Sequence, residues 1–587
     1  MPVKSITLTD KLFVVYWRET TETFLQANLK IALLFLTSFL ILITERAVAY
    51  TSPDRPSIQG GFPRYEAPDG VIVDSLVIDN RNIYDTETER YHHFIFKLAN
   101  KLHYKTRTQV IKSEVLLQVG EPYSSELAEE TARNLRQRLQ LYDAWVETEK
   151  LDNGRLLVRV VTIDEWTLSG GLDVRRDGNE TIYRLGVAER NLLGNNQALS
   201  LEYFIPVTDD NYLIAGFSDR RFLGRTFALE AGYSDNPQGK VRQISFGRPY
   251  YNLLQDLAFG FSLTATGGRR DIYHETRRVA YSHYEGDRAG VFGSYRLGSY
   301  KRKISFTSEY LYRYEQILGT NMSEAVNEED TSVAAAGFPS DSLYHQLGLK
   351  LQLLNLNFTK LKQIDGFRYT EDFVLGQALQ IGLARAFTGG VDSKVFDFFE
   401  LGLSQGYRFG PHLTLLTYYK QFWFNDSKDI RRVTSLSANY YNNASRFITI
   451  AARVIYLSDS RATGAEAVTV GGTGDIRGYN KVFSTGNKKG VINLEGRFYP
   501  DIELLSVVFG GAFFIDAAKS WKSQEALSLN DFSLSIGFGL RVSLERFAKN
   551  RLFRIDAAYS EKNGLQLSIG TDQYFRAQAG SFLLTTP

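Results

Sequence analysis

The sequence predicts a mainly β protein, in which a large antiparallel transmembrane β-barrel follows a small α+β domain. From Glu165 onward, apolar and polar residues alternate along one segment after another. The chain is rich in Tyr (34), Phe (39) and Gly (48) and has only 2 Met. This composition suits strands, turns and the aromatic belts of membrane barrels better than helical bundles. The N-terminal region has the pattern of a secretion signal, which directs the chain toward a membrane outside the cytoplasm.

Residues 1–49 are the predicted signal peptide. Basic residues precede a short apolar run, Ile31 to Thr44, and the small residues Ala47-Val48-Ala49 follow it. These are the three parts of a secretory signal, and the apolar run is shorter than the ~20 residues that a membrane-spanning helix needs. An uncleaved anchor is the alternative. Residues 50–70 contain several Pro, Gly and Asp residues and are a predicted linker.

Residues 71–165 predict a small α+β domain with the order strand, helices, strand, strand. The run from Val71 to Ile78 is typical of a strand, and apolar residues from Leu127 to Leu139 recur at helical spacing. Two strands, Ala144 to Thr148 and Arg155 to Thr162, flank an Asn-Gly pair, which is a strong hairpin signal.

Residues 166–575 predict the barrel, and residues 576–587 form a C-terminal tail. From Ser533 to Leu544 every second residue is apolar, and those between, Arg541 among them, are small or polar. One apolar and one polar face fit lipid outside and water inside. A soluble sandwich would also alternate, but about 410 residues exceed the usual size of one domain. No repeat of the length of a propeller blade is visible.

A glycine-rich stretch, Gly471 to Tyr479, divides the barrel region. Five alternating segments follow it, and eleven to sixteen can be drawn before it. Its glycines allow tight turns and close approach of the backbone. The glycine spacing is wrong for a dinucleotide-binding loop and no helical pattern follows, so that reading fails.

The sequence contains no pattern that indicates catalysis or metal binding. It has no cysteine, its histidines lack the H-E-x-x-H spacing, and no G-x-S-x-G motif is present. The 68 Lys and Arg nearly balance the 66 Asp and Glu, which gives no reason to expect nucleic acid as a partner. We expect no enzymatic activity and no cofactor.

Two carboxylates, Glu495 and Asp516, lie on the polar faces of the two strands that follow the glycine-rich stretch. Both are expected to point into the barrel lumen. If the stretch folds back into the barrel, Arg477 has two acceptors within reach, and a guanidinium forms bidentate hydrogen bonds with carboxylates. The alternative is that all three groups are separately solvated. We expect Arg477→Ala to impair activity, and Arg541→Ala on a neighbouring strand to matter less.

The motif Gly474-Asp475-Ile476-Arg477-Gly478-Tyr479 resembles the lumen-loop motif of the Omp85 superfamily of outer-membrane proteins (BamA/TamA type, bacterial surface antigen barrels). In that family the loop follows the eleventh strand. Glu495 and Asp516 match the acidic partners on the next two strands and would anchor the loop. Residues 71–165 are similar to a single POTRA domain, in which the segment between Ile78 and Thr106, with a helix of its own, looks inserted.

The last alternating segment resembles the C-terminal sorting strand of the family, with Leu565, Leu567, Ile569 and Phe575 on one face. The sequence departs from the family at two places. Ala518 stands where the family has glycine, and the tail 576–587 follows where the family usually ends at an aromatic residue.

The resemblance implies a sixteen-stranded barrel in the bacterial outer membrane, with one periplasmic POTRA domain. Its partners would be the outer-membrane lipid bilayer, unfolded β-rich client polypeptides and periplasmic accessory proteins. The implied function is to insert or export β-rich polypeptides without enzymatic chemistry, at a weak seam between the first strand (near 166–174) and the last (564–575). A passive outer-membrane channel or structural barrel is one alternative, and a two-partner secretion transporter for a dedicated passenger is another.

Overall fold

The structure, a computed structural model, describes most of residues 65–577. Short gaps within this range are 152–153, 178–179, 208–210, 225, 237–238, 275–276, 323–340, 390–393, 426–427, 463–466, 473, 481, 526 and 548–551. The predicted signal peptide (1–49), linker residues 50–64 and tail residues 578–587 lie outside the described residues. The described residues of 65–443 and 447–577 belong to one compact unit, which contains both the N-terminal domain and the barrel.

The N-terminal domain is a three-stranded sheet covered by helices, with the strand order β1-β3-β2. Strand β1 is parallel to β3, and β2 is antiparallel to it. Its main elements are β1 (Val73–Arg81), α2 (Phe94–Leu102), α3 (Thr108–Lys112), α4 (Ser125–Arg138), β2 (Leu141–Lys150) and β3 (Leu156–Asp164). This is the order of elements expected from the sequence, and α2 lies in the segment that looked inserted. No helix among the described residues is long and apolar enough to span a membrane.

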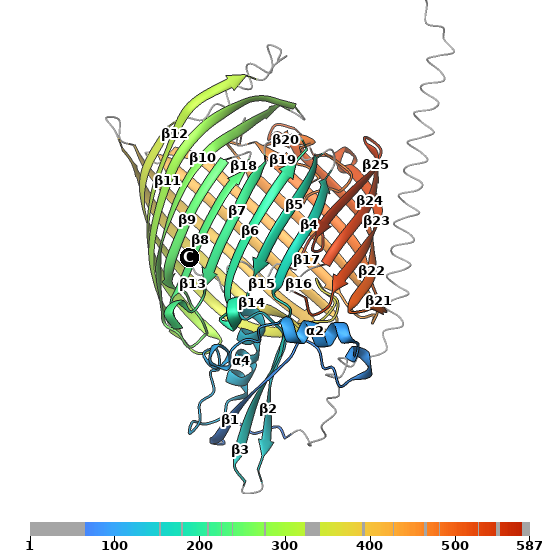
Figure 1. Cartoon of the computed structure of the whole chain (residues 1–587). Coiled ribbons are helices and arrows are strands. Elements are labelled where there is room, and N and C mark those ends of the chain that lie inside the picture. The colour runs from blue at the N-terminus through green and yellow to red at the C-terminus, as the bar shows by residue number, and fades with distance from the viewer. Residues whose placement is uncertain are drawn as a thin grey trace, which may run out of the picture. The chain divides into compact units, whose positions relative to one another are not determined.

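The remaining strands close into one antiparallel barrel, shown in Figure 1. They are β4 (Leu168–Asp177), β5 (Glu180–Glu189), β6 (Gln197–Pro206), β7 (Tyr212–Asp219), β8 (Ala228–Asn236), β9 (Gly239–Arg248), β10 (Leu257–His274), β11 (Arg277–Gly298), β12 (Arg302–Met322), β13 (Ser342–Leu361), β14 (Glu371–Thr388), β15 (Val395–Phe409), β16 (His412–Asn425), β17 (Lys428–Asn442), β18 (Ile448–Asp459), β21 (Lys488–Leu504), β22 (Val507–Trp521), β23 (Ser533–Leu544), β24 (Leu552–Ser560) and β25 (Gly564–Thr571).

The barrel has twenty strands in the described part of the chain, so the expected number of sixteen is wrong. Five strands follow the glycine-rich stretch, as predicted, but fifteen precede it. The number sixteen came from the family resemblance, which places eleven strands before the loop. Because each barrel strand carries only a weak sequence signal, the alternation alone could not choose between eleven and fifteen.

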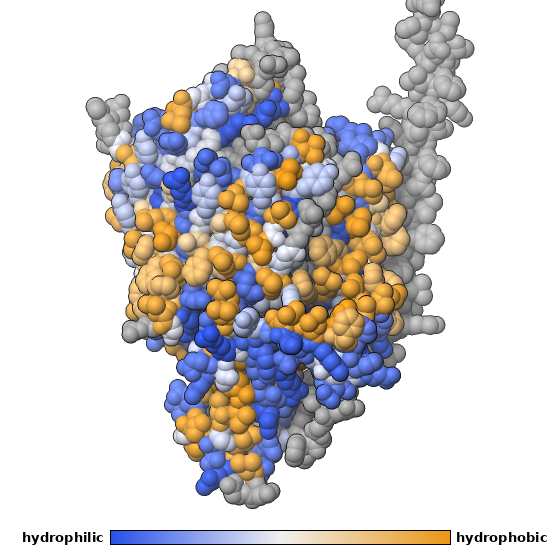
Figure 2. Space-filling view, in the orientation of Figure 1, coloured by the Kyte–Doolittle hydropathy of each residue, from blue (hydrophilic) through white to orange (hydrophobic). Residues whose placement is uncertain are grey.

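Side chains alternate across the barrel wall as the sequence predicted. In β23, Ile536, Phe538 and Leu540 are exposed on the outer surface, whereas Ser535 and Arg541 are buried. The space-filling view in Figure 2 shows apolar residues gathered in a band around the visible part of the barrel. Such a band is the surface that a membrane barrel presents to lipid.

The wall is weakest where the first and last strands meet. Between the described residues of β25 and β4, a single residue pair is in register, Ile569 with Arg176. By comparison, β25 has eight paired positions with β24, and β4 has ten with β5. The junction therefore has the weak pairing that the resemblance led us to expect.

The N-terminal domain packs against the barrel through polar contacts from α4 and its neighbours. The Arg136 guanidinium donates to both carboxylate oxygens of Asp372, at 2.6 and 2.7 Å. The backbone N–H of Leu253 donates to Glu130 at 2.7 Å. These α4 side chains are nearly fully buried, so the domain is held by desolvated charges and not only by surface contacts.

Candidate functional site

The glycine-rich stretch joins two short strands, β19 (Val468–Val470) and β20 (Ser484–Gly486), and packs against the barrel wall. Ile476 and Tyr479 are 0% and 3% exposed. They pack in one cluster with Val491 of β21 and Ala518 of β22. Ala518, which departs from the family pattern, therefore lies directly against the motif.

Gly478 allows the stretch to lie close to β24. Its φ of +81° falls in the left-handed region, and a Cβ at this position would lie 3.1 Å from the Cβ of Ala558. Its carbonyl oxygen accepts hydrogen bonds from the Ser560 hydroxyl at 3.2 Å and from the Asn563 side chain at 3.1 Å. Gly474 also has a positive φ, +93°, but open space surrounds its Cβ position.

Arg477 lies between the two carboxylates named from the sequence, and all three side chains are fully buried. Its Nε and Nη2 donate to the two oxygens of Asp516 at 2.7 and 2.8 Å. Its Nη1 donates to Glu495 at 2.5 Å, and its backbone N–H donates to Asp516 at 3.1 Å. The pairing with Asp516 is bidentate, which fixes the direction of the guanidinium as well as its charge.

Aromatic rings lie close to the same guanidinium. The Cζ atom of Arg477 is 3.5 Å from the ring centroid of Phe514 and 4.2 Å from that of Tyr574. Both distances are within the range of cation–π attraction, which strengthens when water is excluded.

The network extends to two further arginines. Arg497 Nε donates to Glu495 at 2.9 Å, and Arg541 Nη1 donates to Asp556 at 2.6 Å. Arg541 also lies 3.6 Å from Glu495 and is 1% exposed. Each buried charge thus has an opposite charge beside it, as burial requires.

Arg541→Ala was expected to matter less than Arg477→Ala, and the structure places Arg541 in the same buried network. Arg497 and Asp556 are members of the network that the sequence did not single out. A usable signal existed for Arg497, because it follows Glu495 by two residues and shares its inward face. No comparable signal marks Asp556, because its place beside Arg541 depends on the register of β23 and β24.

Asp475 and Gly474 are held by polar contacts that run beside the arginine network. Asp475 accepts from Lys489 Nζ at 3.0 Å, and the carbonyl of Gly474 accepts from Arg453 Nη2 at 2.5 Å. Asn493 connects the two sets, because its amide donates to Asp516 at 2.8 Å and to the Asp475 carbonyl at 2.9 Å. All six residues of the predicted motif therefore lie along the inner wall formed by β18 and β21–β24 or in contact with it.

The C-terminal segment differs from the expectation. Strand β25 ends at Thr571, and Asp572 has a φ of +64°, so the chain leaves the strand before Phe575. Leu565 and Leu567 are exposed on the outside, whereas Phe575 is 3% exposed. Phe575 therefore does not share the outer face of the last strand. The aromatic end suggested a continuous strand, but the left-handed turn at Asp572 breaks the alternation.

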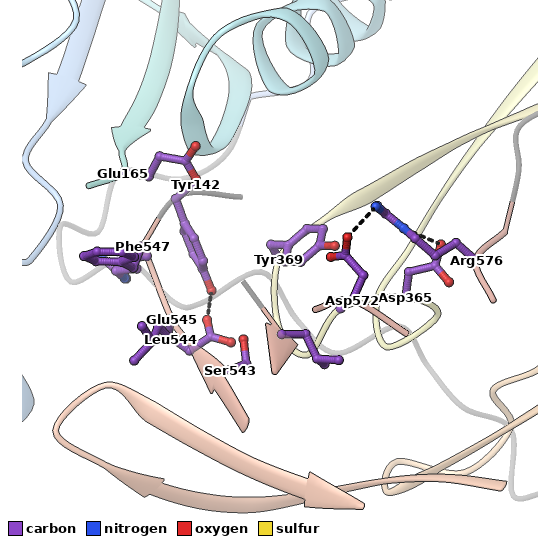
Figure 3. A pocket seen from close by; sticks show the side chains of 13 residues that line it. Tyr142, Glu165, Asp365, Tyr369, Ser543, Leu544, Glu545, Phe547, Asp572 and Arg576 are labelled. Carbon is purple, nitrogen blue, oxygen red and sulfur yellow. Dashed lines mark hydrogen bonds and ion pairs between the residues drawn. The ribbon is translucent and has the colours of Figure 1, made fainter. Parts of the chain in front are cut away.

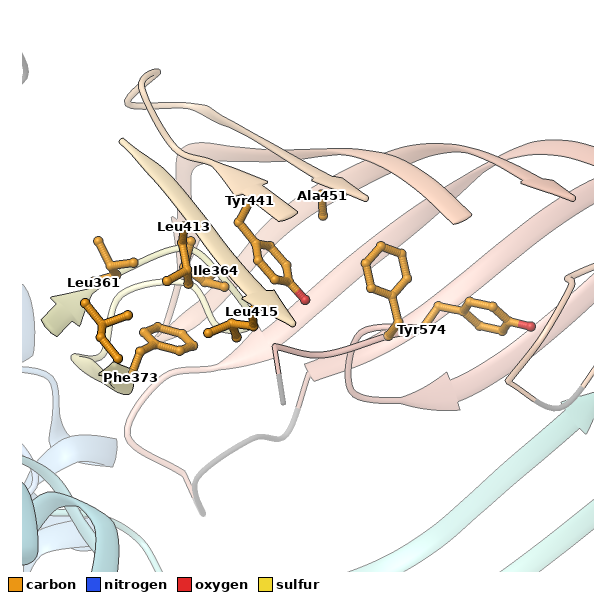
Figure 4. Close-up of a cluster of buried hydrophobic side chains, with 10 residues drawn as sticks. Leu361, Ile364, Phe373, Leu413, Leu415, Tyr441, Ala451 and Tyr574 are labelled. Atoms are coloured by element: carbon orange, nitrogen blue, oxygen red, sulfur yellow. The ribbon is translucent and has the colours of Figure 1, made fainter. Parts of the chain in front are cut away.

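Tyr574 and Phe575 belong instead to an internal hydrophobic cluster, whose buried side chains are drawn in Figure 4. The Phe575 carbonyl accepts from Arg497 Nη2 at 2.6 Å. The Tyr574 hydroxyl donates to the Gly472 carbonyl in the glycine-rich stretch at 2.9 Å. The segment after the last strand is thus bonded to the glycine-rich stretch and to Arg497 of the arginine network.

A small polar cavity of about 30 Å³ lies where the N-terminal domain meets the barrel, shown in Figure 3. Tyr142 of β2 donates to Glu545 at 2.8 Å on its wall. Burial raises the pKa of Glu545 above its usual value. The cavity has room for about one water molecule, which makes it too small for a substrate.

Nothing in this arrangement points to a chemical reaction. Among the residues that the structure describes, no group of three or more His, Cys, Asp or Glu side chains could hold a metal ion. Arg477 and Arg497 donate to carboxylates and a carbonyl of the protein itself. Nη2 of Arg541 has no hydrogen-bond partner in the described part of the chain and lies 3.6 Å from Glu495. The arrangement can orient a loop and join it to the wall.

No family model matches the sequence, and no match was found among curated proteins. Among solved structures the chain is similar to BamA from Haemophilus ducreyi lacking POTRA domains 1–3, at 13% identity and a TM-score of 0.37, covering 86% of this chain and 85% of that one. It is also similar to CdiB from Escherichia coli, at 11% identity and a TM-score of 0.43, covering 97% and 99%. Because these scores are low, the proposals below rest on the chain's own geometry.

Proposed function

We propose that this chain is an outer-membrane protein of the BamA/TamA type, which inserts or exports β-rich polypeptides without enzymatic chemistry. In this proposal residues 71–165 are a POTRA domain in the periplasm, and the barrel spans the membrane. The observation that carries the proposal is the junction of β25 and β4, with its single residue pair.

A weakly paired junction in lipid provides a template for another strand. Backbone N–H and C=O groups without partners are costly in the hydrocarbon region, because no water is present to bond them. Strand edges therefore pair readily with further strands. A client strand that pairs with β4 or β25 gains these hydrogen bonds and starts a new barrel wall.

The sheet of the N-terminal domain has an edge strand that can pair with a client, in addition to the barrel junction. In its sheet β3 is central, and the beginning of β1 is bonded through Val73 to the turn at Gly120 and Glu121. Strand β2 is the other edge of the sheet. We propose that β2 receives an extended client segment by β-augmentation, in which main-chain hydrogen bonds provide affinity.

The interior favours this function over a passive channel. The glycine-rich loop and the Tyr574-Phe575 segment are folded inside the barrel and are bonded to each other. A passive channel needs a lumen that stays open, whereas these segments fill part of it.

A reversible lock on the junction tests the proposal. The chain has no cysteine, so Ile569→Cys with Arg176→Cys introduces a single disulfide across the one paired position. The matched control is Ile569→Cys with Ile555→Cys, which locks the same residue to its fully paired neighbour β24. The assay is the rate at which vesicles that contain the protein fold a urea-denatured small outer-membrane barrel.

We expect the junction lock to abolish the acceleration of client folding and a reductant to restore it, while the control lock leaves it unchanged. Equal rates with the junction locked and open would contradict the proposal. Ion conductance that is large without client and unaffected by it would favour the passive channel.

A further inference from the structure

Helix α2 carries an apolar stripe that faces away from the protein. Phe94, Leu98 and Leu102 are 67%, 48% and 61% exposed, and they recur every four residues on one face. Phe96, on the other side of the helix, is 3% exposed and packs in a cluster with Ile83. The helix is therefore anchored by one face, and its other face is unpartnered among the described residues.

The charged residues of α2 are all basic. Lys97 and Lys101 are exposed beside the apolar stripe, and no acidic residue occurs from Tyr91 to Arg107. A helix with an apolar face and a basic polar face is typical of helices that lie in the interface of a membrane with anionic lipids. Lysine stems can cover apolar surface while their ammonium groups reach the headgroups.

Contacts on either side of α2 tie it to the barrel near the weak junction. Before the helix, Tyr84 is hydrogen-bonded to Ser506 in the β21–β22 turn, at 3.4 Å. After it, the N–H of Arg107 donates to Gly194 in the β5–β6 turn, at 3.0 Å. In the order of the sheet, the junction of β25 and β4 lies between these two turns.

The nearby barrel elements expose further apolar side chains. Leu504 and Leu505 beside the β21–β22 turn are 65% and 55% exposed, Leu168 at the start of β4 is 47% exposed, and Leu193 in the β5–β6 turn is 51% exposed. In Figure 2, apolar residues also gather at the place where Figure 1 labels α2, at the lower edge of the apolar band. The exposed stripe of α2 is thus close to the surface that the barrel presents to lipid.

We propose that α2 is an interfacial helix whose apolar face, Phe94, Ile95, Leu98 and Leu102, inserts into the periplasmic leaflet of the membrane beside the junction of β25 and β4. Lys97 and Lys101 bind anionic lipid headgroups there. The occupant is lipid and not a protein partner, because the stripe adjoins the lipid-facing band and is bordered by basic residues. The inference rests on the membrane location of the barrel, but not on its handling of clients.

Bromolipid quenching of a fluorophore on a single cysteine tests this contact in the full chain. The probe is placed by Leu98→Cys, and the protein is reconstituted in vesicles of phosphatidylethanolamine and phosphatidylglycerol. Leu540→Cys, an exposed outer position of β23, reports the membrane location of the barrel itself. Val119→Cys, 59% exposed in the loop before α4 and in the part of the domain near the start of β1, is the control for exposure to water.

We expect brominated lipid to reduce fluorescence at Leu98 and at Leu540 by about half or more and to leave Val119 unchanged. Replacing phosphatidylglycerol with phosphatidylcholine is expected to reduce the quenching at Leu98 but not at Leu540. If Leu98→Cys does not fold, Leu102→Cys takes its place.

Quenching at Leu540 without quenching at Leu98 and Leu102 would overturn the role of α2, and the membrane location of the barrel would stand. A probe at Leu98 that is shielded from water but not quenched would also overturn it, because a protein surface would then cover the helix. No quenching at any position would contradict the membrane location itself.

Discussion

The wall from β21 to β24 and the junction of β25 with β4 are neighbours that differ in how they are held. The wall has long antiparallel ladders and is joined to the glycine-rich loop by Arg477, Glu495 and Asp516. The junction has one pair in register. The barrel therefore has a wall that is held by many hydrogen bonds and ion pairs, β21–β24, next to a weakly paired junction, β25 with β4.

The difference shows how a closed barrel can keep a weak edge without losing its shape. Arg541 of β23 donates to Gln573, two residues after the end of β25, at 3.1 Å. Arg497 donates to the carbonyl of Phe575. The end of the last strand is thus held from inside the barrel, so its position depends less on pairing with β4.

Removing the guanidinium of Arg477 is expected to have the largest effect. Arg477→Ala leaves the buried carboxylate of Asp516 without its arginine and leaves Glu495 with Arg497 as its donor. Breaking a buried pair costs about 3–5 kcal/mol. The measurement is urea unfolding in vesicles, followed by gel mobility. Arg385→Ala is the control, because Arg385 pairs with Asp397 on the neighbouring strand but is exposed, and no measurable change is expected. Equal effects of the two substitutions would contradict the special role of Arg477.

Hydrogen exchange compares the two sectors directly. Amide hydrogens of β4 that face β25 have few partners, whereas those of β22 are bonded on both sides. We expect the amides of β4 that face the junction to exchange roughly a hundredfold faster than those of β22. Local opening has the smallest free-energy cost where hydrogen bonds are few. Similar protection in the two strands would show that the junction is closed in solution.

The substitution Gly478→Ala, which adds one methyl group, tests how closely the glycine-rich loop packs against β24. Gly478→Ala forces a left-handed backbone and a contact with Ala558, which is expected to cost about 1–3 kcal/mol. Gly474→Ala introduces backbone strain but no close contact, because open space surrounds the Cβ position at Gly474. Its loss of folding stability should therefore be smaller. Unfolding midpoints of the two variants give the difference, and a larger loss at Gly474 would contradict the packing described here.

The smallest expected effect is at Glu545, where the N-terminal domain meets the barrel. Burial raises the pKa of Glu545 in the folded state, so the folded protein binds this proton more tightly than the unfolded chain does. Its contribution to stability is fully present below the unfolded pKa, about 4.3, and is lost as the pH rises through the raised pKa.

Glu545→Gln removes the titration and keeps an oxygen that can accept from Tyr142. We expect the variant to gain stability relative to the native protein as the pH rises through this window, by about 1 kcal/mol or less. Thermal unfolding at a series of pH values measures the difference. A constant difference at every pH would rule out the role of this carboxyl.

Much of the fold and of the site follows from local patterns in the sequence. Alternation places Glu495 and Asp516 on inward faces, and glycine spacing marks the loop, so the Arg477 pairing could be anticipated. The twenty-strand total could not be, because weak strand signals before Gly471 permit several counts. The place of Phe575 could not be either, since it depends on one backbone turn at Asp572.

The contacts of Arg477 also set an order for folding. Arg477 comes before both of its carboxylates in the chain, and Asp516 lies 39 residues further on. Contacts between distant parts of a chain form late, because the loop between them must close first. Until β21 and β22 are both in place, Arg477 has no buried position to occupy. Seating of the loop by Arg477 therefore follows the formation of β21 and β22.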